Sequence, residues 1–203
     1  LLVLDNLDSR ELIERQLEDL IGAKHLACCP YERLVVADSA IHEMEEYLAD
    51  VFRKAWARNP NRTDVIPGHV YFNEPLNEDQ RAAARRAFES SISLMTGGAG
   101  SGKTFTIDSL IRACEDLGLS YELAAPTGKA AKRLEQSVKR PAKTVHRLLG
   151  FNGHTFAKGP DDKLEADFLV VDEVSMVDVP LMYRLFRALD LTRTAVLLAG
   201  DHN

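Results

Sequence analysis

Residues 97–104 read GGAGSGKT, and this segment constrains the fold more than any other part of the sequence. It fits the pattern G-x-x-x-x-G-K-[ST], follows the apolar run 92–96 and opens a segment of helical character that extends to about residue 117. Glycines let the backbone wrap around phosphate groups, and a helix N-terminus adds a partial positive charge. The segment therefore predicts a strand, a phosphate-binding loop (P-loop) and a helix, in that order.

The P-loop predicts ATP and Mg²⁺ as cofactors. Lys103 is expected to reach the β- and γ-phosphates, and Thr104 to bind Mg²⁺. We assign the following residues of this segment to ATP binding: Gly97, Gly98, Ala99, Gly100, Ser101, Gly102, Lys103, Thr104 and Phe105.

A second acidic site follows the apolar run Phe168–Val171. Four apolar residues predict a buried strand, and Asp172 and Glu173 follow at its carboxyl end, where ligands of parallel sheets bind. Asp172 is expected to hold Mg²⁺ through water, and Glu173 to orient or deprotonate the attacking water. The predicted catalytic residues are thus Lys103, Asp172 and Glu173. A glutamate at this position favours hydrolysis over phosphotransfer, because a kinase needs no base for water.

Strands and helices alternate in the second part of the chain. The pattern predicts strands at 92–96, 121–125, 168–171 and 195–199, and helices at 77–90, after the P-loop, 127–137 and 179–189. Such alternation predicts an α/β fold of the P-loop NTPase type, with a parallel sheet and helices on both faces. The segment 151–166 is expected to be an inserted loop or hairpin.

Residues 1–73 show a different pattern, with two amphipathic helices near 12–21 and 41–55 and a short β-like run at 34–36. A loop rich in Pro, Asn and Gly follows the second helix. We predict a small, mostly helical accessory domain at 1–73 and an ATP-binding lobe at 74–203.

The charge is distributed unevenly. The whole chain carries a formal net charge of −6, which points away from a nucleic-acid partner, but residues 127–147 contain seven basic residues and one acidic residue. Thr127 and Lys129 lie near the start of this basic strip, and Thr144 and His146 lie near its end. An isolated charge run is usually a solvated helix face, and Thr127 is also a natural helix N-cap. The strip alone therefore leaves DNA binding open.

Two positions have alternative interpretations. Gln80 lies three residues after Asn77, which is the spacing of a helix capping box. Alternatively, its side-chain amide reads the hydrogen-bonding edge of adenine. Asp201 follows the last predicted strand and is either a turn residue or a group that senses the γ-phosphate.

Membrane and extracellular classes are disfavoured. No apolar run approaches the roughly 20 residues that a membrane helix needs, so we expect no membrane partner. Three cysteines show neither a disulfide framework nor zinc spacing, which favours a reduced, cytoplasmic compartment.

Together these residues resemble superfamily 1 DNA helicases of the RecD/TraA (exodeoxyribonuclease V alpha-like) branch. Six segments between residues 76 and 201 match in the order of the family: LNEDQRAA, GGAGSGKT, APTGKAAKRL, TVHRLLG, VVDEVSM and LLAGD. The resemblance implies a RecA-like lobe in which Gln80 contacts adenine and Asp201 links the ATP state to DNA. It also implies a single-stranded DNA path along Thr127, Lys129, Thr144 and His146.

The resemblance implies the ATP-binding first motor lobe of an ATP-dependent 5′-to-3′ DNA helicase, acting in DNA repair and recombination. In the family, Gly-Asp is followed within three residues by Gln, whereas this sequence stops at Asn203. We therefore expect a fragment that is inactive alone and needs a second RecA-like lobe, with subunits of a nuclease–helicase complex as further partners. The alternatives are a small-molecule P-loop kinase and a non-catalytic module that binds DNA or a partner.

Overall fold

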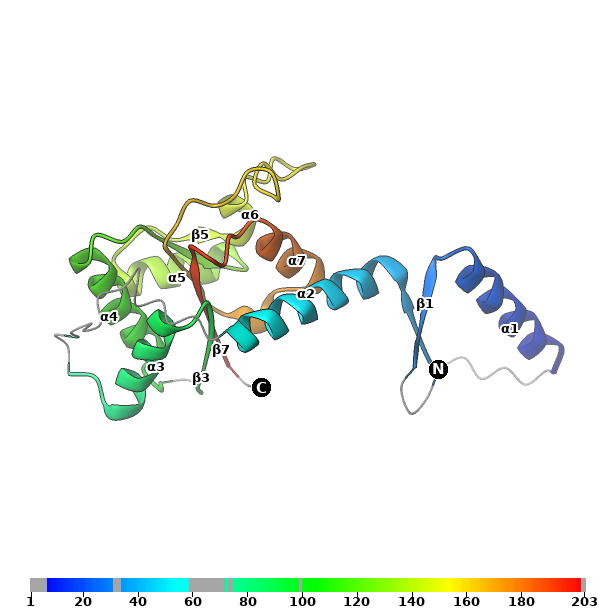
Figure 1. The fold of residues 1–203 in the computed structure, drawn as a ribbon, viewed down its shortest axis with the longest axis horizontal. Coiled ribbons are helices and arrows are strands. Elements are labelled where there is room, and N and C mark those ends of the chain that lie inside the picture. The colour runs from blue at the N-terminus through cyan, green and yellow to red at the C-terminus, as the bar shows by residue number, and fades with distance from the viewer. Residues whose placement is uncertain (1–6, 31–33, 59–71, 73–74, 99, 202–203) are drawn as a thin grey trace. The chain divides into compact units, whose positions relative to one another are not determined.

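The computed structural model describes residues 7–30, 34–58, 72, 75–98 and 100–201 (Figure 1). The chain divides into two compact units, Leu1–Ala49 and Asp50–Asn203. The domain boundary predicted at residues 73 and 74 falls outside the described residues, so it stays a prediction.

The first unit combines a helix with a two-stranded hairpin. Helix α1 spans Leu7–Gly22, and strands β1 (Leu26–Pro30) and β2 (Leu34–Asp38) pair antiparallel. The long helix α2 (Ser39–Arg58) begins in this unit, where the Asp38 carboxylate accepts hydrogen bonds from the backbone N–H groups of Ala40 and Ile41. Both predicted helices and the β-like run at 34–36 are confirmed, whereas β1 was not predicted. No helix in the described ranges has the length and apolar character needed to cross a bilayer.

The second unit is built on a five-stranded sheet in the order β3-β7-β6-β4-β5, and every neighbouring pair is parallel. Its strands are β3 (Ile92–Thr96), β4 (Tyr121–Ala125), β5 (Lys143–Thr144), β6 (Phe168–Val171) and β7 (Ala195–Gly200). The parallel α/β sheet predicted from the sequence is therefore confirmed. Strands β6 and β7 are buried along their whole lengths, which explains why they read as continuous apolar runs.

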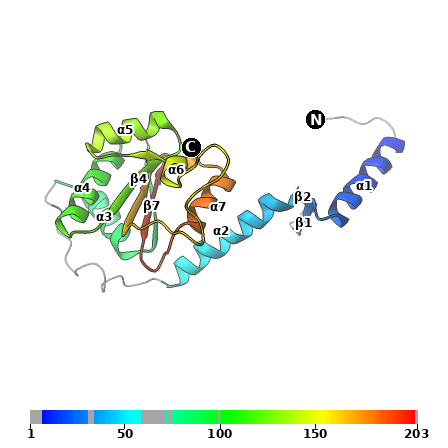
Figure 2. The same ribbon diagram turned by 90° about the horizontal axis from the view of Figure 1, so that it is seen from above.

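Helices cover both faces of this sheet (Figure 2). Helices α3 (Glu78–Glu89), α4 (Lys103–Asp116) and α5 (Gly128–Val138) lie on one face, and α6 (Val145–Leu148) and α7 (Val179–Arg187) lie on the other. A short 3₁₀ helix, Val174–Met176, follows β6. Helix α6 and strand β5 were not predicted. The segment 151–166 contains neither helix nor strand, so its assignment as a loop is confirmed.

The core under α3 and α4 fixes the position of the P-loop. Phe88 of α3 packs against Phe168 of β6, with ring centroids 5.2 Å apart. Ile107, Leu110 and Ile111 of α4 are fully buried beside them. Each such side chain contributes about 1.5–3 kcal/mol to folding by leaving water. This packing holds α4, and therefore the loop that precedes it, firmly against the sheet.

Candidate nucleotide-binding site

The P-loop connects the end of β3 at Thr96 to the start of α4 at Lys103. Gly100 and Gly102 have φ values of +79° and +85°, a left-handed conformation that side-chain-bearing residues rarely adopt. Gly102 is the N-cap of α4, and no side chain caps the helix there. The first N–H groups of α4 therefore stay available to an anion, which the helix dipole also attracts.

The loop is also closely packed at two glycines. A Cβ at Gly97 would overlap Oγ of Ser101, and a Cβ at Gly102 would overlap Nε2 of Gln80. The absence of a side chain at these glycines leaves room for the neighbouring Ser101 and Gln80 side chains. The uncapped start of α4 and the left-handed glycines fit a chain of phosphate groups. Ala99 lies outside the described residues.

Lys103 is held by oxygen atoms from two sides of the site. Its ammonium group donates to the carbonyl oxygens of Gly97 and Gly98, the latter at 3.3 Å, and forms an ion pair with Asp201. The parallel register that pairs Thr96 of β3 with Gly200 of β7 explains why Asp201 lies beside the P-loop. The structure therefore brings together Lys103 and Asp201, two of the residues predicted from the sequence.

Asp172 follows β6 at the same edge of the sheet. Its backbone N–H donates to the carbonyl oxygen of Ala124 at 2.9 Å, which continues the pairing of β6 with β4. Burial raises the pKa of Asp172 above its usual value, and the charge of Lys103 partly opposes this shift. Thr104 lies half-buried in the first turn of α4, and the side chain of Phe105 is exposed.

Glu173 has an unusual backbone conformation. Its φ is +54°, in the left-handed region, which costs a residue with a side chain about 1–2 kcal/mol. The carboxylate of Glu173 lies 3.8 Å from the guanidinium of Arg133 on α5. Sequence reasoning missed Arg133 as a member of the site. The one sequence signal for Arg133 was its place in the basic strip 127–147, because nothing in the sequence pairs it with Glu173.

The capping-box interpretation of Gln80 is confirmed. The Asn77 side chain accepts from the backbone N–H of Gln80 at 2.8 Å, and the Gln80 side chain accepts from the backbone N–H of Asn77 at 3.1 Å. Gln80 also reaches the P-loop, because its Nε2 donates to the carbonyl oxygen of Ser101 at 3.3 Å. The adenine contact implied by the resemblance stays a prediction.

Two of the predicted DNA-binding residues are helix N-caps at one edge of the sheet. Thr127 caps α5 by accepting from the N–H of Ala130, and Thr144 caps α6 by accepting from the N–H of Arg147, both at 3.2 Å. The parallel pairing of Ala125 with Thr144 brings the two caps close together. Both Thr side chains thus have a structural role in the fold as helix caps.

Lys129 and His146 have different surroundings. The Lys129 side chain is exposed in the first turn of α5. His146 lies in an aromatic cluster, with its ring centroid 5.4 Å from that of Phe151 and 5.8 Å from that of Phe156. The guanidinium of Arg184, on α7, lies 5.4 Å from the centroid of Phe156. This cluster ties α6 and the segment after it to α7.

Part of the basic strip is neutralised within the fold. Arg140 forms ion pairs with Asp108 at 3.3 Å and Glu115 at 2.7 Å, and Lys143 pairs with Glu122 at 2.9 Å. Arg133, as described above, pairs with Glu173. Fewer cations of the strip are therefore open to a nucleic acid than the sequence alone indicates.

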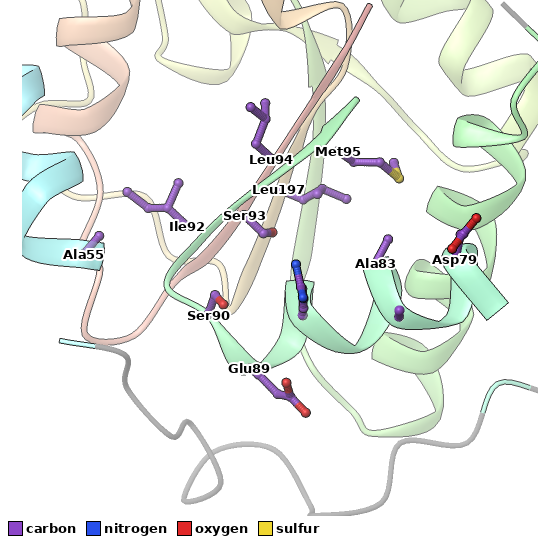
Figure 3. Close-up of a pocket in the computed structure, with 12 residues that line it drawn as sticks. Ala55, Asp79, Ala83, Glu89, Ser90, Ile92, Ser93, Leu94, Met95 and Leu197 are labelled. Atoms are coloured by element: carbon purple, nitrogen blue, oxygen red, sulfur yellow. The ribbon is translucent and has the colours of Figure 1, made fainter. Parts of the chain in front are cut away.

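A hollow of about 850 Å³ lies beside the edge strand β3 and helix α3 (Figure 3). Its lining includes Ile92, Leu94, Ala83 and Leu197, but none of the described P-loop residues. Within the described part of the chain, no group of three or more His, Cys, Asp or Glu side chains is arranged to hold a metal ion.

Comparison with known proteins agrees with the assignment of the P-loop as a nucleotide-binding site. Over 162 residues, the chain is 40% identical to the ATP-dependent RecD2 DNA helicase of Deinococcus radiodurans, covering 77% of this chain and 22% of that protein. Over 160 residues, it is 38% identical to the RecBCD enzyme subunit RecD of Haemophilus influenzae, covering 64% of this chain and 25% of that subunit. The chain thus spans about a quarter of the length of these relatives.

A solved structure, the Pif1 helicase from Candida albicans, aligns with a TM-score of 0.45 and 20% identity over 63% of this chain and 33% of that one. Residues 80–203 match the AAA domain family. That match covers the P-loop, both acidic positions after β6 and the end of β7. The chain therefore belongs to the AAA domain family and is a relative of the RecD and RecD2 helicases.

Proposed function

We propose that this chain is the ATP-binding first motor lobe of an ATP-dependent 5′-to-3′ DNA helicase of the RecD type. The observation that carries the proposal is the P-loop at the carboxyl edge of a parallel sheet, with Lys103, Asp172 and Asp201 gathered around it. Similarity to RecD and RecD2 helicases supports this function over a small-molecule kinase or a non-catalytic module. The direction of movement rests on the family resemblance.

The residues of the site have complementary roles in hydrolysis. Lys103 and the N-terminal amides of α4 bind the phosphates, and Gly100 and Gly102 let the backbone approach them. Thr104 and Asp172 would hold Mg²⁺, which supplies charge neutralisation at the phosphates. Glu173 orients the attacking water and accepts its proton.

Coupling to DNA runs along the edge of the sheet that carries Thr127 and Thr144. These caps bind phosphates of single-stranded DNA together with Lys129, and His146 lies next to them on α6. A second RecA-like lobe in the same polypeptide closes over the nucleotide and supplies an arginine finger, worth about 10³- to 10⁵-fold in rate. We further propose that the parent protein acts in the cytoplasm, in DNA repair and recombination, with subunits of a nuclease–helicase complex.

The test is nucleotide binding and hydrolysis by the purified chain, with and without single-stranded DNA. We expect weak binding of ATP–Mg²⁺ and negligible turnover, because the arginine finger is contributed by the second lobe. Lys103→Ala should abolish nucleotide binding, because the ammonium contacts the phosphates. Glu173→Gln should leave binding unchanged, because Glu173 acts only on water.

Four outcomes would contradict the proposal. Wild-type chain that binds no nucleotide would remove its basis, and Lys103→Ala with full affinity would place the nucleotide elsewhere. Transfer of phosphate from ATP to a nucleoside or nucleotide would identify a kinase instead. Turnover at ordinary helicase rates would show that no second lobe is needed.

A further inference from the structure

Gln80 is fixed at both ends of its side-chain amide. Its Oε1 accepts from the backbone N–H of Asn77 at 3.1 Å, and its Nε2 donates to the carbonyl oxygen of Ser101 at 3.3 Å. Asn77 also accepts from the backbone N–H of Gln80 at 2.8 Å. The side chain therefore links the first turn of α3 to a loop that lies 21 residues further along the chain.

The same amide packs on the residue that starts α4. A Cβ at Gly102 would overlap Nε2 of Gln80 and would lie 3.5 Å from its Cδ. Gly102 holds a φ of +85° and directly precedes Lys103. Gln80 thus contacts the P-loop at two consecutive residues, by a hydrogen bond at Ser101 and by packing at Gly102.

This contact has a defined effect on the phosphate cradle. The carbonyl of Ser101 and the N–H of Gly102 belong to one planar trans peptide unit, so they point in opposite directions. A hydrogen bond that holds the carbonyl toward Gln80 therefore turns the N–H of Gly102 away from Gln80. That N–H belongs to the group of P-loop donors that a phosphate would meet.

We infer that Gln80 is a positioning residue, which holds the Ser101–Gly102 peptide in the orientation that binds phosphate. This inference rests on the proposed nucleotide-binding function and deepens it. A residue that only reads adenine would act on the base and leave the phosphates unaffected. A residue that orients the P-loop acts on every ligand with a phosphate chain, whatever its base.

The experiment compares three ligands on the full 203-residue chain by calorimetry: ADP–Mg²⁺, GDP–Mg²⁺ and inorganic tripolyphosphate. Gln80→Met removes both hydrogen bonds of the amide but keeps the length of the side chain and adds no charge. We expect it to weaken all three ligands, tripolyphosphate included, by about 3- to 10-fold, the range of the one hydrogen bond to the P-loop that is lost. Asn77→Ala is the matched control, because it breaks the other half of the capping box and should leave tripolyphosphate affinity unchanged.

A measurement on the wild-type chain covers the case in which Gln80→Met does not fold. The side-chain amide signals of Gln80 are followed by NMR during separate titrations with tripolyphosphate and with adenosine. We expect these signals to shift with tripolyphosphate, which has no base, whether or not they also respond to adenosine.

The outcomes separate this inference from the proposed function. If Gln80→Met weakens only ADP, or keeps full tripolyphosphate affinity, the inference is overturned while the proposed function stands. Gln80 signals that respond to adenosine alone would also overturn it. A wild-type chain that binds none of the three ligands would overturn the proposed function and this inference with it.

Discussion

At the residue scale, the ion pair between Lys103 and Asp201 was not predictable from the sequence. Lys103 and Asp201 are 98 residues apart in the chain, and their ion pair depends on the pairing of β3 with β7. A motif reports which residue types a site needs, because each type supplies one kind of chemistry. It does not report contacts such as Arg133 with Glu173, which arise only when distant elements pack together.

The pairing of Lys103 with Asp201 leads to a prediction about nucleotide affinity. A phosphate that binds Lys103 must displace the Asp201 carboxylate and then tolerate its negative charge nearby. We expect Asp201→Asn to strengthen ADP binding by the isolated chain by about 3- to 10-fold, because the competing charge-assisted bond is lost. The measurement is titration with a fluorescent ADP analogue.

The control for this change is Asp161→Asn, which removes one exposed carboxylate from the loop 151–166. It should leave the affinity for ADP unchanged. Equal or weaker ADP binding by Asp201→Asn would show that Asp201 does not compete for Lys103.

At the element scale, elements with a strong apolar pattern were predictable and elements without one were not. Helices α2, α3 and α4 carry apolar residues at helical spacing over several turns, and β6 and β7 are unbroken apolar runs. Strand β5 has two residues and exists only because it pairs with β4, and α6 has four. The order of the strands follows from packing between distant segments, so no local pattern could give it.

Arg140 joins the end of α5 to α4, which makes stability depend on pH. The hydrogen bond from Arg140 lowers the pKa of Glu115 from 4.5 to about 2, with a further contribution from the Tyr121 hydroxyl. Because the folded-state pKa is the lower one, this contribution is complete above about pH 4.5 and is lost as the pH falls toward 2.

We expect Glu115→Gln to reduce the free energy of unfolding at pH 6 and to have a smaller effect at pH 3. Urea denaturation of both proteins at the two pH values measures the difference, and Glu89→Gln on α3 is the control. An effect of equal size at both pH values would mean that the charge of Glu115 does not stabilise the fold.

At the scale of the whole molecule, the net charge of −6 does not reflect the local excess of basic residues between 127 and 147. The sequence located the basic strip between residues 127 and 147, but only the structure shows that Arg133, Arg140 and Lys143 already have acidic partners. The sequence could not show this, because the acidic partners lie outside the strip and meet it only when the elements pack together. These partners are Asp108, Glu115, Glu122 and Glu173.

This distribution predicts a modest salt dependence for DNA binding. Two or three phosphate contacts from this lobe would give a slope of about −1.4 to −2.1 in log affinity against log salt, at about 0.7 per contact. Fluorescence anisotropy with a labelled oligothymidine at several salt concentrations measures this slope. Lys129→Gln should reduce its magnitude by about 0.7, and Lys139→Gln provides a comparison at the other end of α5. A flat response would refute the assignment of the strip to DNA.

The register of β3 and β7 also determines where this chain tolerates changes in length. One residue added or removed within β7 would turn every following side chain to the opposite face of the sheet and would move Asp201 away from Lys103. The exposed turn at Asn152–Thr155 is closed by its own hydrogen bonds and pairs with no strand. Insertions acquired in evolution, or reporter peptides placed by engineering, are therefore compatible with this turn and incompatible with β7.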